Sequence, residues 1–101
     1  MIKMAKSTIR DFSMLYEAVL SLKSKEECEA FFTDLFTITE LQSATQRLIV
    51  ADMLYHKKTC QYISDATGAS TATVTRVNKC LNYGPGGYGM ILKRLNNEET
   101  E

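Results

Sequence analysis

The sequence predicts an all-α protein of about six helices. Apolar residues recur at spacings of three and four along most of the 101-residue chain, which is the periodicity of helices with one buried face. No stretch alternates apolar and polar residues as a half-buried strand would. There is one proline, and four of the five glycines fall within residues 84–89, so helix breakers are few and late.

The first predicted helix is capped by Ser7 or Thr8 and ends near residue 22. Its apolar stripe is wide and well formed, with Phe12, Leu15, Tyr16, Val19 and Leu20 on one side. A stripe of this width needs a partner surface, and a chain this short supplies little of it. We therefore expect part of that surface to belong to a second subunit.

Two capping boxes predict the next two helix starts. Ser24 with Glu27 begins one helix, and Thr39 with Gln42 begins another, over residues 40–56. The aromatic face of the first (Phe31, Phe32, Phe36) is more typical of a core or a dimer seam than of a ligand site. The apolar set of the second is Leu41, Ala44, Leu48, Ala51, Met53, Leu54 and Tyr55, widened by Ile49 and Val50.

A helix-turn-helix is predicted over residues 59–81, and the rest of the chain is organised around it. One short helix covers residues 59–66 and Gly68 ends it in a left-handed conformation. Ser70 then caps a second helix that runs to about residue 81. Two helices joined by a tight turn with glycine form the unit that places its second helix in a DNA major groove.

The second helix of this motif has two different faces. Val74, Val77 and Leu81 are spaced by three and four, so they share a face that can pack on Ile63 and Ala69. The opposite face suits groove reading, because it is small, hydrogen-bonding or cationic: Thr71, Ala72, Thr75, Arg76 and Lys79. An ordinary amphipathic pair in a helical core is the alternative. Tyr62 is expected to face the core.

Residues 82–89 are predicted to form a loop, because they hold four glycines and the proline. A phosphate-cradling loop is disfavoured, since no strand precedes it and no Lys-Ser or Lys-Thr follows. A short helix over residues 90–95 exposes Lys93 and Arg94. We expect a single domain over residues 1–96 and a disordered acidic tail over residues 97–101.

Composition predicts a cytoplasmic protein with reduced thiols. Cys28, Cys60 and Cys80 are an odd number without a CxxC pair, and we expect Cys80 to be half-buried. The chain shows neither a signal peptide nor an apolar run long enough to span a membrane. Enzyme activity and metal binding are not expected, because no catalytic set or zinc-ligand spacing surrounds the single histidine, His56, which we interpret as a helix-end charge or phosphate contact.

Charge is balanced, with twelve basic and twelve acidic side chains. A neutral protein counts against nucleic-acid binding, but the charges are segregated. Residues 1–10 hold three cations and no acid, and residues 56–81 hold four Lys or Arg against Asp65 alone. A protein with such a dipolar charge distribution can present a basic face to a polyanion, although each cluster can equally be solvated surface.

Two segments resemble the Trp repressor family, and more narrowly its small YerC/YecD-like members. One is LFTITEL at residues 35–41 with QRL at 46–48; the other is GASTATVTR at residues 68–76. The resemblance covers roughly residues 35–95 and implies an intertwined helical homodimer that binds double-stranded DNA as a sequence-specific transcriptional repressor. By resemblance, the DNA-binding residues are Gln61, Ser64, Ser70, Thr71, Ala72, Thr75, Arg76 and Lys79. A helical protein-interaction module that keeps the fold without binding an operator is the alternative.

The resemblance also implies an effector pocket, at Gln46, Thr73, Arg76, Val77 and Cys80. Arg76 and Thr73 match the tryptophan-sensing pattern. Gln46 stands in place of a second arginine, Val77 replaces a small glycine beside the indole, and Cys80 is a weaker polar partner than serine. Each lost charged contact costs about 1.5–3 kcal/mol, so we expect no tryptophan co-repressor. Arg76 is then a phosphate contact or a structural ion pair.

Overall fold

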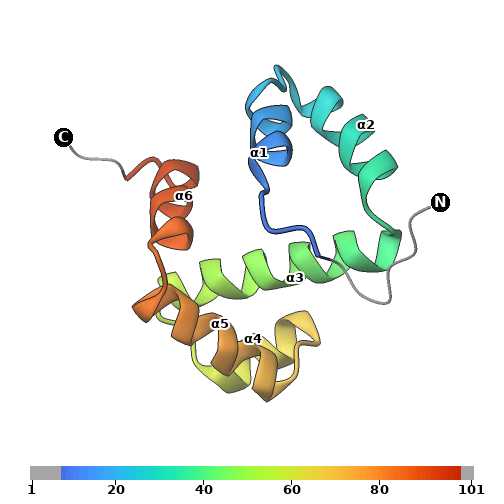
Figure 1. The fold of residues 1–101 in the computed structure, drawn as a ribbon. Helices are drawn as coiled ribbons and strands as arrows, with labels where there is room; N and C mark the ends of the chain where they lie inside the picture. Colours follow the sequence, from blue (N-terminus) through green and yellow to red (C-terminus); the bar gives the residue numbers. More distant parts are fainter. Residues whose placement is uncertain (1–7, 99–101) are drawn as a thin grey trace. The chain divides into compact units, whose positions relative to one another are not determined.

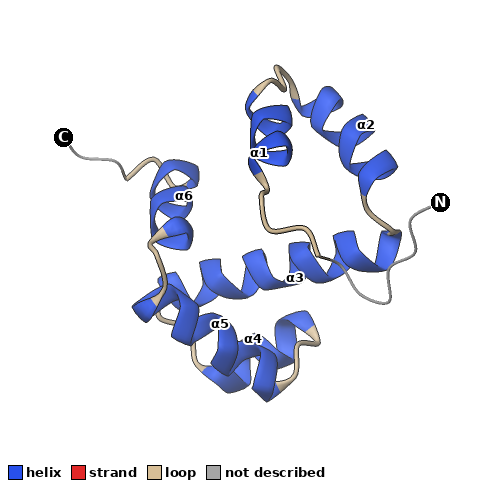
Figure 2. Ribbon diagram, in the orientation of Figure 1, coloured by secondary structure: helices blue, strands red, loops and turns tan. Residues whose placement is uncertain are grey.

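The computed structural model describes residues 8–98, and within them every regular element is a helix. The six helices, α1 to α6, are drawn in Figure 1, and Figure 2 shows the short loops that join them. The all-α prediction is therefore confirmed. The chain divides into two compact units, Met1–Thr37 and Ile38–Glu101. The prediction of one domain over residues 1–96 stays a prediction.

In the first unit, α1 (Ser13–Leu20) begins later than the sequence suggested. The Asp11 carboxylate accepts a hydrogen bond from the Ser13 backbone N–H at 3.0 Å. Hydrogen bonding to Ser13 lowers the pKa of Asp11. A side chain that bonds its neighbouring backbone competes with helix formation, so residues 8–12 are not helical. The prediction that Thr8 caps this helix was wrong, and the alternative, Ser7, lies outside the described residues.

The helix α2 (Lys25–Leu35) begins where its capping box predicted. Ser24 Oγ accepts from the Glu27 N–H at 3.1 Å, and Glu27 Oε1 accepts from the Lys23 N–H at 2.8 Å. The box therefore closes on Lys23, one residue before the usual position. The rings of Phe31, Phe32 and Phe36 contact one another in sequence, with centroids 5.9 and 5.5 Å apart. Neither α1 nor α2 contains a buried residue.

The second unit contains α3 (Ile38–Tyr55), α4 (Cys60–Thr67), α5 (Thr71–Tyr83) and α6 (Gly87–Leu95). Figure 1 shows α4 and α5 along one side of α3, with α6 near its C-terminal end. The predicted cap at Thr39 was wrong, because α3 begins at Ile38 and includes Thr39 in its first turn. Thr37 directly precedes the helix, and Glu40 follows three residues later, so this pair has the capping-box spacing instead.

The core of the second unit is built by α3 to α6 and the turn after α4. Its buried side chains are Val50, Ala51, Ile63, Ala69, Val74, Val77 and Leu92. The predicted packing of the α5 face on Ile63 and Ala69 is confirmed, with Leu81 partly buried against the same cluster. On α3, however, Val50 is central, whereas Ala44 and Leu48 are exposed. The N-terminal half of α3 therefore presents apolar residues that this unit leaves uncovered.

The C-terminal end of the described chain is held by two hydrogen bonds. The Glu98 N–H donates to the Lys93 carbonyl at 2.8 Å, and Tyr55 Oη donates to Glu98 Oε1 at 2.6 Å. The helix α6 begins at Gly87, three residues earlier than predicted, and Lys93 and Arg94 are exposed as expected. The remaining part of the predicted acidic tail, residues 99–101, lies outside the described residues.

Candidate nucleic-acid interface

The turn between α4 and α5 has a defined cap on each side. Thr59 Oγ1 accepts from the Tyr62 N–H at 3.1 Å and begins α4. Gly68 ends it with a φ of 75°, in the left-handed region that favours glycine. Ser70 Oγ then accepts from the Thr73 N–H at 3.1 Å and begins α5. The predicted cap at Ser70 and the left-handed Gly68 are therefore confirmed, and Thr59 is the N-cap of α4.

Polar contacts hold this turn against the rest of the unit. Gln46 Nε2, on α3, donates to the Thr67 carbonyl oxygen at 3.2 Å. The Thr67 hydroxyl donates to the Ile63 carbonyl at 2.7 Å and accepts from the Ala69 N–H at 3.1 Å. The last carbonyls of a helix have no partner within that helix. Gln46 therefore satisfies one of them and fixes the start of α5 relative to α3.

The two faces of α5 differ as predicted. Val74 and Val77 are buried, and the side chains on the opposite face are exposed: Ser70, Thr71, Ala72, Thr75, Arg76 and Lys79. A helix whose inner face is fixed by packing can present its outer face in one orientation. The first turns of α5 thus carry hydroxyl and methyl groups, and two cations follow.

On α4, the outward direction differs from the prediction. Gln61 is exposed, as expected, and its amide donates to Asp65 Oδ1 at 3.0 Å. Ser64 was expected to be exposed, but it is half-buried, and its Oγ is fully covered without a partner in the described residues. Tyr62 was expected to face the core, but it is 51% exposed. The side chains of successive helix residues point in directions about 100° apart. Because Ile63 points into the core, the neighbouring Tyr62 points toward solvent.

A set of cations lies around this helix pair. Lys57, Lys58, Arg76 and Lys79 are exposed, and no carboxylate ion pair to any of the four occurs within residues 8–98. Lys58 Nζ lies 5.3 Å from the centroid of the Tyr62 ring. His56, by contrast, is engaged by its own helix, because its Nδ1 lies 2.8 Å from the Asp52 carbonyl oxygen and 3.5 Å from Asp52 Oδ1.

The structure does not gather the predicted effector residues around one cavity. Gln46 is committed to Thr67, and Thr73 Oγ1 accepts from Ser70 Oγ at 3.1 Å. Val77 is 1% exposed and belongs to the core. Arg76 extends from the exposed face of α5. The expectation that Cys80 is half-buried was wrong, since it is exposed, near the solvent-facing C-terminal half of α5.

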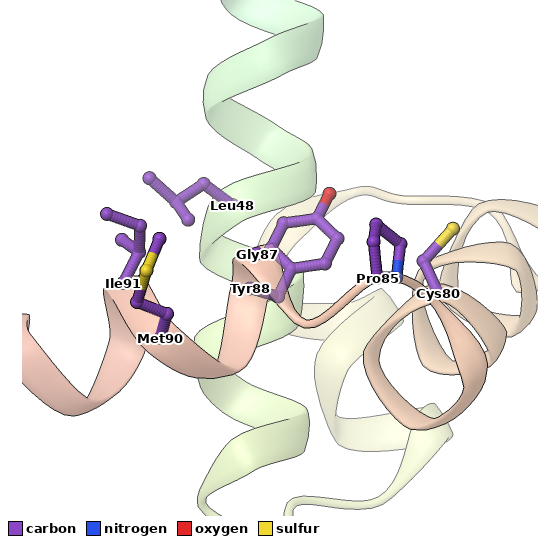
Figure 3. Close-up of a pocket in the computed structure, with 7 residues that line it drawn as sticks. All are labelled: Leu48, Cys80, Pro85, Gly87, Tyr88, Met90 and Ile91. Carbon is purple, nitrogen blue, oxygen red and sulfur yellow. The ribbon is translucent and has the colours of Figure 1, made fainter.

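Cys80 does line an apolar cavity of about 560 Å³. Figure 3 shows its walls, which come from α3, α5, the loop after α5, and α6: Leu48, Cys80, Pro85, Gly87, Tyr88, Met90 and Ile91. Sequence reasoning missed this surface because it treated residues 82–89 as a plain loop. The signal available was the run of apolar residues that follows Gly87.

The comparisons with known proteins agree with this geometry. A family model described as Trp repressor protein matches residues 10–96. The chain belongs to the Trp repressor family. The match includes α1 and α2, which extends the resemblance well beyond the segments that suggested it from the sequence.

Individual family relatives support the same assignment. The protein YerC of Bacillus subtilis (strain 168), described as uncharacterized, is 51% identical over 92 residues, which is 91% of this chain and 88% of that protein. A solved TrpR-like protein from Eubacterium eligens ATCC 27750 aligns with a TM-score of 0.81 at 46% identity, over 87% of this chain and 91% of that one. A second solved structure, from Staphylococcus aureus, gives the same TM-score and identity over 89% of both chains.

No group of three or more potential metal ligands occurs within residues 8–98. In the same part of the chain, none of the helices is both long and apolar enough to cross a lipid bilayer.

Proposed function

We propose that this Trp repressor family protein is a sequence-specific DNA-binding transcriptional regulator that acts as a homodimer and represses its target. The observation that carries the proposal is the division of α5 into a buried face at Val74 and Val77 and an exposed face that begins at Thr71. Family membership supports it, since a helix-turn-helix presents its second helix to the major groove.

Each exposed side chain on α5 has a chemistry suited to one part of a duplex. The Thr71 and Thr75 hydroxyls can donate to or accept from base edges, and their methyl groups and that of Ala72 can contact thymine methyl groups. Arg76 and Lys79 follow at the end of this surface and can neutralise phosphates. On α4, Gln61 can reach the same duplex, whereas the covered hydroxyl of Ser64 supports a structural position rather than a base contact.

A net charge of zero does not prevent this binding mode. The cations around the reading helix are Lys57, Lys58, Arg76 and Lys79, and the nearby acid Asp65 already accepts a hydrogen bond from Gln61. Because electrostatic interactions are screened over about 8 Å at physiological salt, a duplex on this face senses these cations more strongly than distant carboxylates.

Homodimerisation is supported by apolar side chains that the chain itself leaves uncovered. On α1, Met14 is 85% exposed and Leu20 is 84% exposed. In the second unit, Leu48, Met90 and Ile91 form the wall of an open apolar cavity. An exposed apolar patch such as this cavity wall marks an interaction site. We place the second copy there, so that two reading helices address two half-sites.

The regulator we propose does not depend on tryptophan. Gln46 donates its amide to Thr67, and Val77 is buried in the core. Both observations support the proposal, because Gln46 carries no charge and the Val77 side chain takes up space that the resemblance gives to an indole ring. The alternative function is a protein-interaction module. Two observations support this alternative: the zero net charge and the uncovered apolar surface.

Fluorescence anisotropy with a labelled duplex tests the proposal, with the mass in solution measured by sedimentation. We expect a dimer whose duplex affinity falls steeply with salt, because cations displace counterions from phosphates. The Thr71→Ala/Thr75→Ala variant should remain a dimer and lose preference between sequences. A dimer that binds no duplex at low salt would leave the interaction module as the better account.

A further inference from the structure

A second cavity, of about 630 Å³, lies in the Ile38–Glu101 unit. It lies between the end of α3, the turn after it, the C-terminal half of α5 and the start of α6. Its walls are divided between the apolar side chains of Leu54 and Leu81 and the polar side chains of Lys57, Lys58, Asn78 and Asn82. This size is typical of small-molecule sites, which combine an apolar body with a few placed polar groups.

Lys57 has a backbone conformation that favours glycine, and its position in the cavity wall gives a functional reason for a lysine there. Lys57 has a φ of 66°, in the left-handed region. Its N–H donates to the Leu54 carbonyl at 2.9 Å, and the Lys58 N–H donates to the Met53 carbonyl at 3.0 Å. This pair of bonds is the helix-ending motif that normally places glycine at this position. A side chain here is strained, and such strain concentrates at ligand sites.

The positive charge in this cavity is not compensated by a carboxylate in its wall. Neither lysine forms an ion pair within residues 8–98, and Lys58 instead lies over the Tyr62 ring. No acidic side chain of the described residues lines the cavity. Asp52 lies beside His56, and the Glu98 carboxylate is hydrogen-bonded to Tyr55, which also lines the cavity. The negative end of α3 contributes roughly half a unit of charge, less than two lysines supply.

Two residues of the polar wall, Asn78 and Asn82, lie on the reading helix α5. Asn82 Nδ2 donates to Asn78 Oδ1 at 3.2 Å, which orders the two amides. The Asn78 NH₂ group has no protein acceptor in the described part of the chain and can donate to an anion. Asn78 lies three residues after Thr75 and next to Lys79, so a molecule bound here contacts the helix that carries the proposed DNA-reading residues.

We propose that this cavity binds a small amphipathic anion, a carboxylate or phosphate monoester with an apolar group, and that its binding changes the affinity of α5 for DNA. The second half rests on the proposed function. The tryptophan-sensing pattern places an effector pocket at five residues, and none of them lines this cavity: Gln46, Thr73, Arg76, Val77 and Cys80. It is therefore a separate site.

Phenyl phosphate is the probe, titrated into the isotopically labelled full chain while amide chemical shifts are recorded. We expect the amides of Lys57, Asn78 and Asn82 to shift, with a Kd at least tenfold lower than for inorganic phosphate or phenol alone. Lys57→Gly should weaken phenyl phosphate at least fivefold while raising the midpoint of urea unfolding, because glycine relieves the left-handed residue. Asn78→Ala should also weaken it, and Lys93→Ala should not.

Three outcomes would overturn the proposed ligand binding. Equal affinity for inorganic phosphate would remove the apolar half of the site. Unchanged phenyl phosphate binding in both Lys57→Gly and Asn78→Ala would place the ligand elsewhere. Shifts at Lys57 with duplex DNA but none with phenyl phosphate would make these lysines DNA contacts only. Duplex affinity, compared with and without bound phenyl phosphate at matched ionic strength, should change at least threefold; an unchanged value would refute the regulatory half and leave DNA binding intact.

Discussion

The side-chain amide of Gln46 donates a hydrogen bond to the Thr67 carbonyl, 21 residues away in sequence. Thr67 is the last residue of α4; Gly68 follows it directly, and Ser70 caps α5 two residues after Gly68. The orientation of α5 is thus set by one polar contact from α3 as well as by the buried face at Val74 and Val77. A residue expected from the resemblance to belong to an effector pocket instead supports the turn of the helix-turn-helix.

Gln46→Ala should lower the free energy of unfolding by about 1 kcal/mol, because the part-buried Thr67 carbonyl loses its donor. Urea unfolding of the wild-type protein and the variant measures this difference. Gln42→Ala, on an exposed position of the same helix, is the matched control and should be close to neutral. Equal stability of the two variants would show that the hydrogen bond contributes nothing.

Gly68→Ala should cost about 1–2 kcal/mol of stability, since its φ of 75° is unfavourable for a residue with a Cβ atom. The space around an added Cβ is open, so the cost comes from the backbone and not from a clash. Gly87→Ala has open space and a helical backbone, and it should be neutral or stabilising by up to about 1 kcal/mol. Urea midpoints compare the two, and similar values would contradict the assigned role of Gly68.

Lys79→Ala should weaken duplex binding similarly for all sequences. If Lys79 neutralises one phosphate, the slope of log affinity against log salt should fall by about 0.9 per subunit. Anisotropy titrations over a range of salt concentrations measure that slope. Lys93→Ala, an exposed lysine on α6, serves as the control for total charge, and the same loss in both variants would argue against a specific phosphate contact.

Tyr55 should titrate above the ordinary pKa of a tyrosine. Its hydrogen bond to Glu98 raises the pKa of the phenol, with burial and the carboxylate charge acting in the same direction. A raised folded-state pKa favours the neutral form, so this contribution to stability is present below about pH 10 and is lost as the pH rises through the folded-state pKa. Tyrosinate absorbance follows the titration. Glu98→Gln should bring the late component forward, and Tyr55→Phe should remove it; a curve unchanged in both would refute the assignment.

The helix-turn-helix could be predicted closely from the sequence because its signals are local. Thr59, Gly68 and Ser70 act through their own neighbouring backbone, and the spacing of Val74 and Val77 fixes the buried face of α5. Each of these depends on residues only a few positions apart. The resemblance to the Trp repressor family, first seen in two short segments, was confirmed over most of the chain.

The predictions that failed depended on competition or on distant contacts. Thr8 does not cap α1, because Asp11 accepts a hydrogen bond from the Ser13 backbone and the helix begins at Ser13. Thr39 does not cap α3, because that helix begins at Ile38. Ile63 fills the core, Ser64 is half-buried and Tyr62 is exposed, whereas Ser64 was expected to contact DNA and Tyr62 to face the core. The contact between Gln46 and Thr67, and the cavity that joins Lys57 to Asn78, link residues about 20 positions apart and leave no periodic signal in the sequence.

Selection of bound duplexes from a random pool tests the central claim most directly, with the wild-type protein and the Thr71→Ala/Thr75→Ala variant run in parallel, with and without tryptophan. Wild type should enrich a two-fold symmetric sequence whose half-sites lie one helical turn apart, about 34–36 Å. Tryptophan should leave that sequence and its enrichment unchanged, and the variant should lose the preference at specific bases while still binding duplex. No enriched sequence with wild type, or the same sequence enriched by the variant, would contradict the assignment of α5 as the helix that reads DNA.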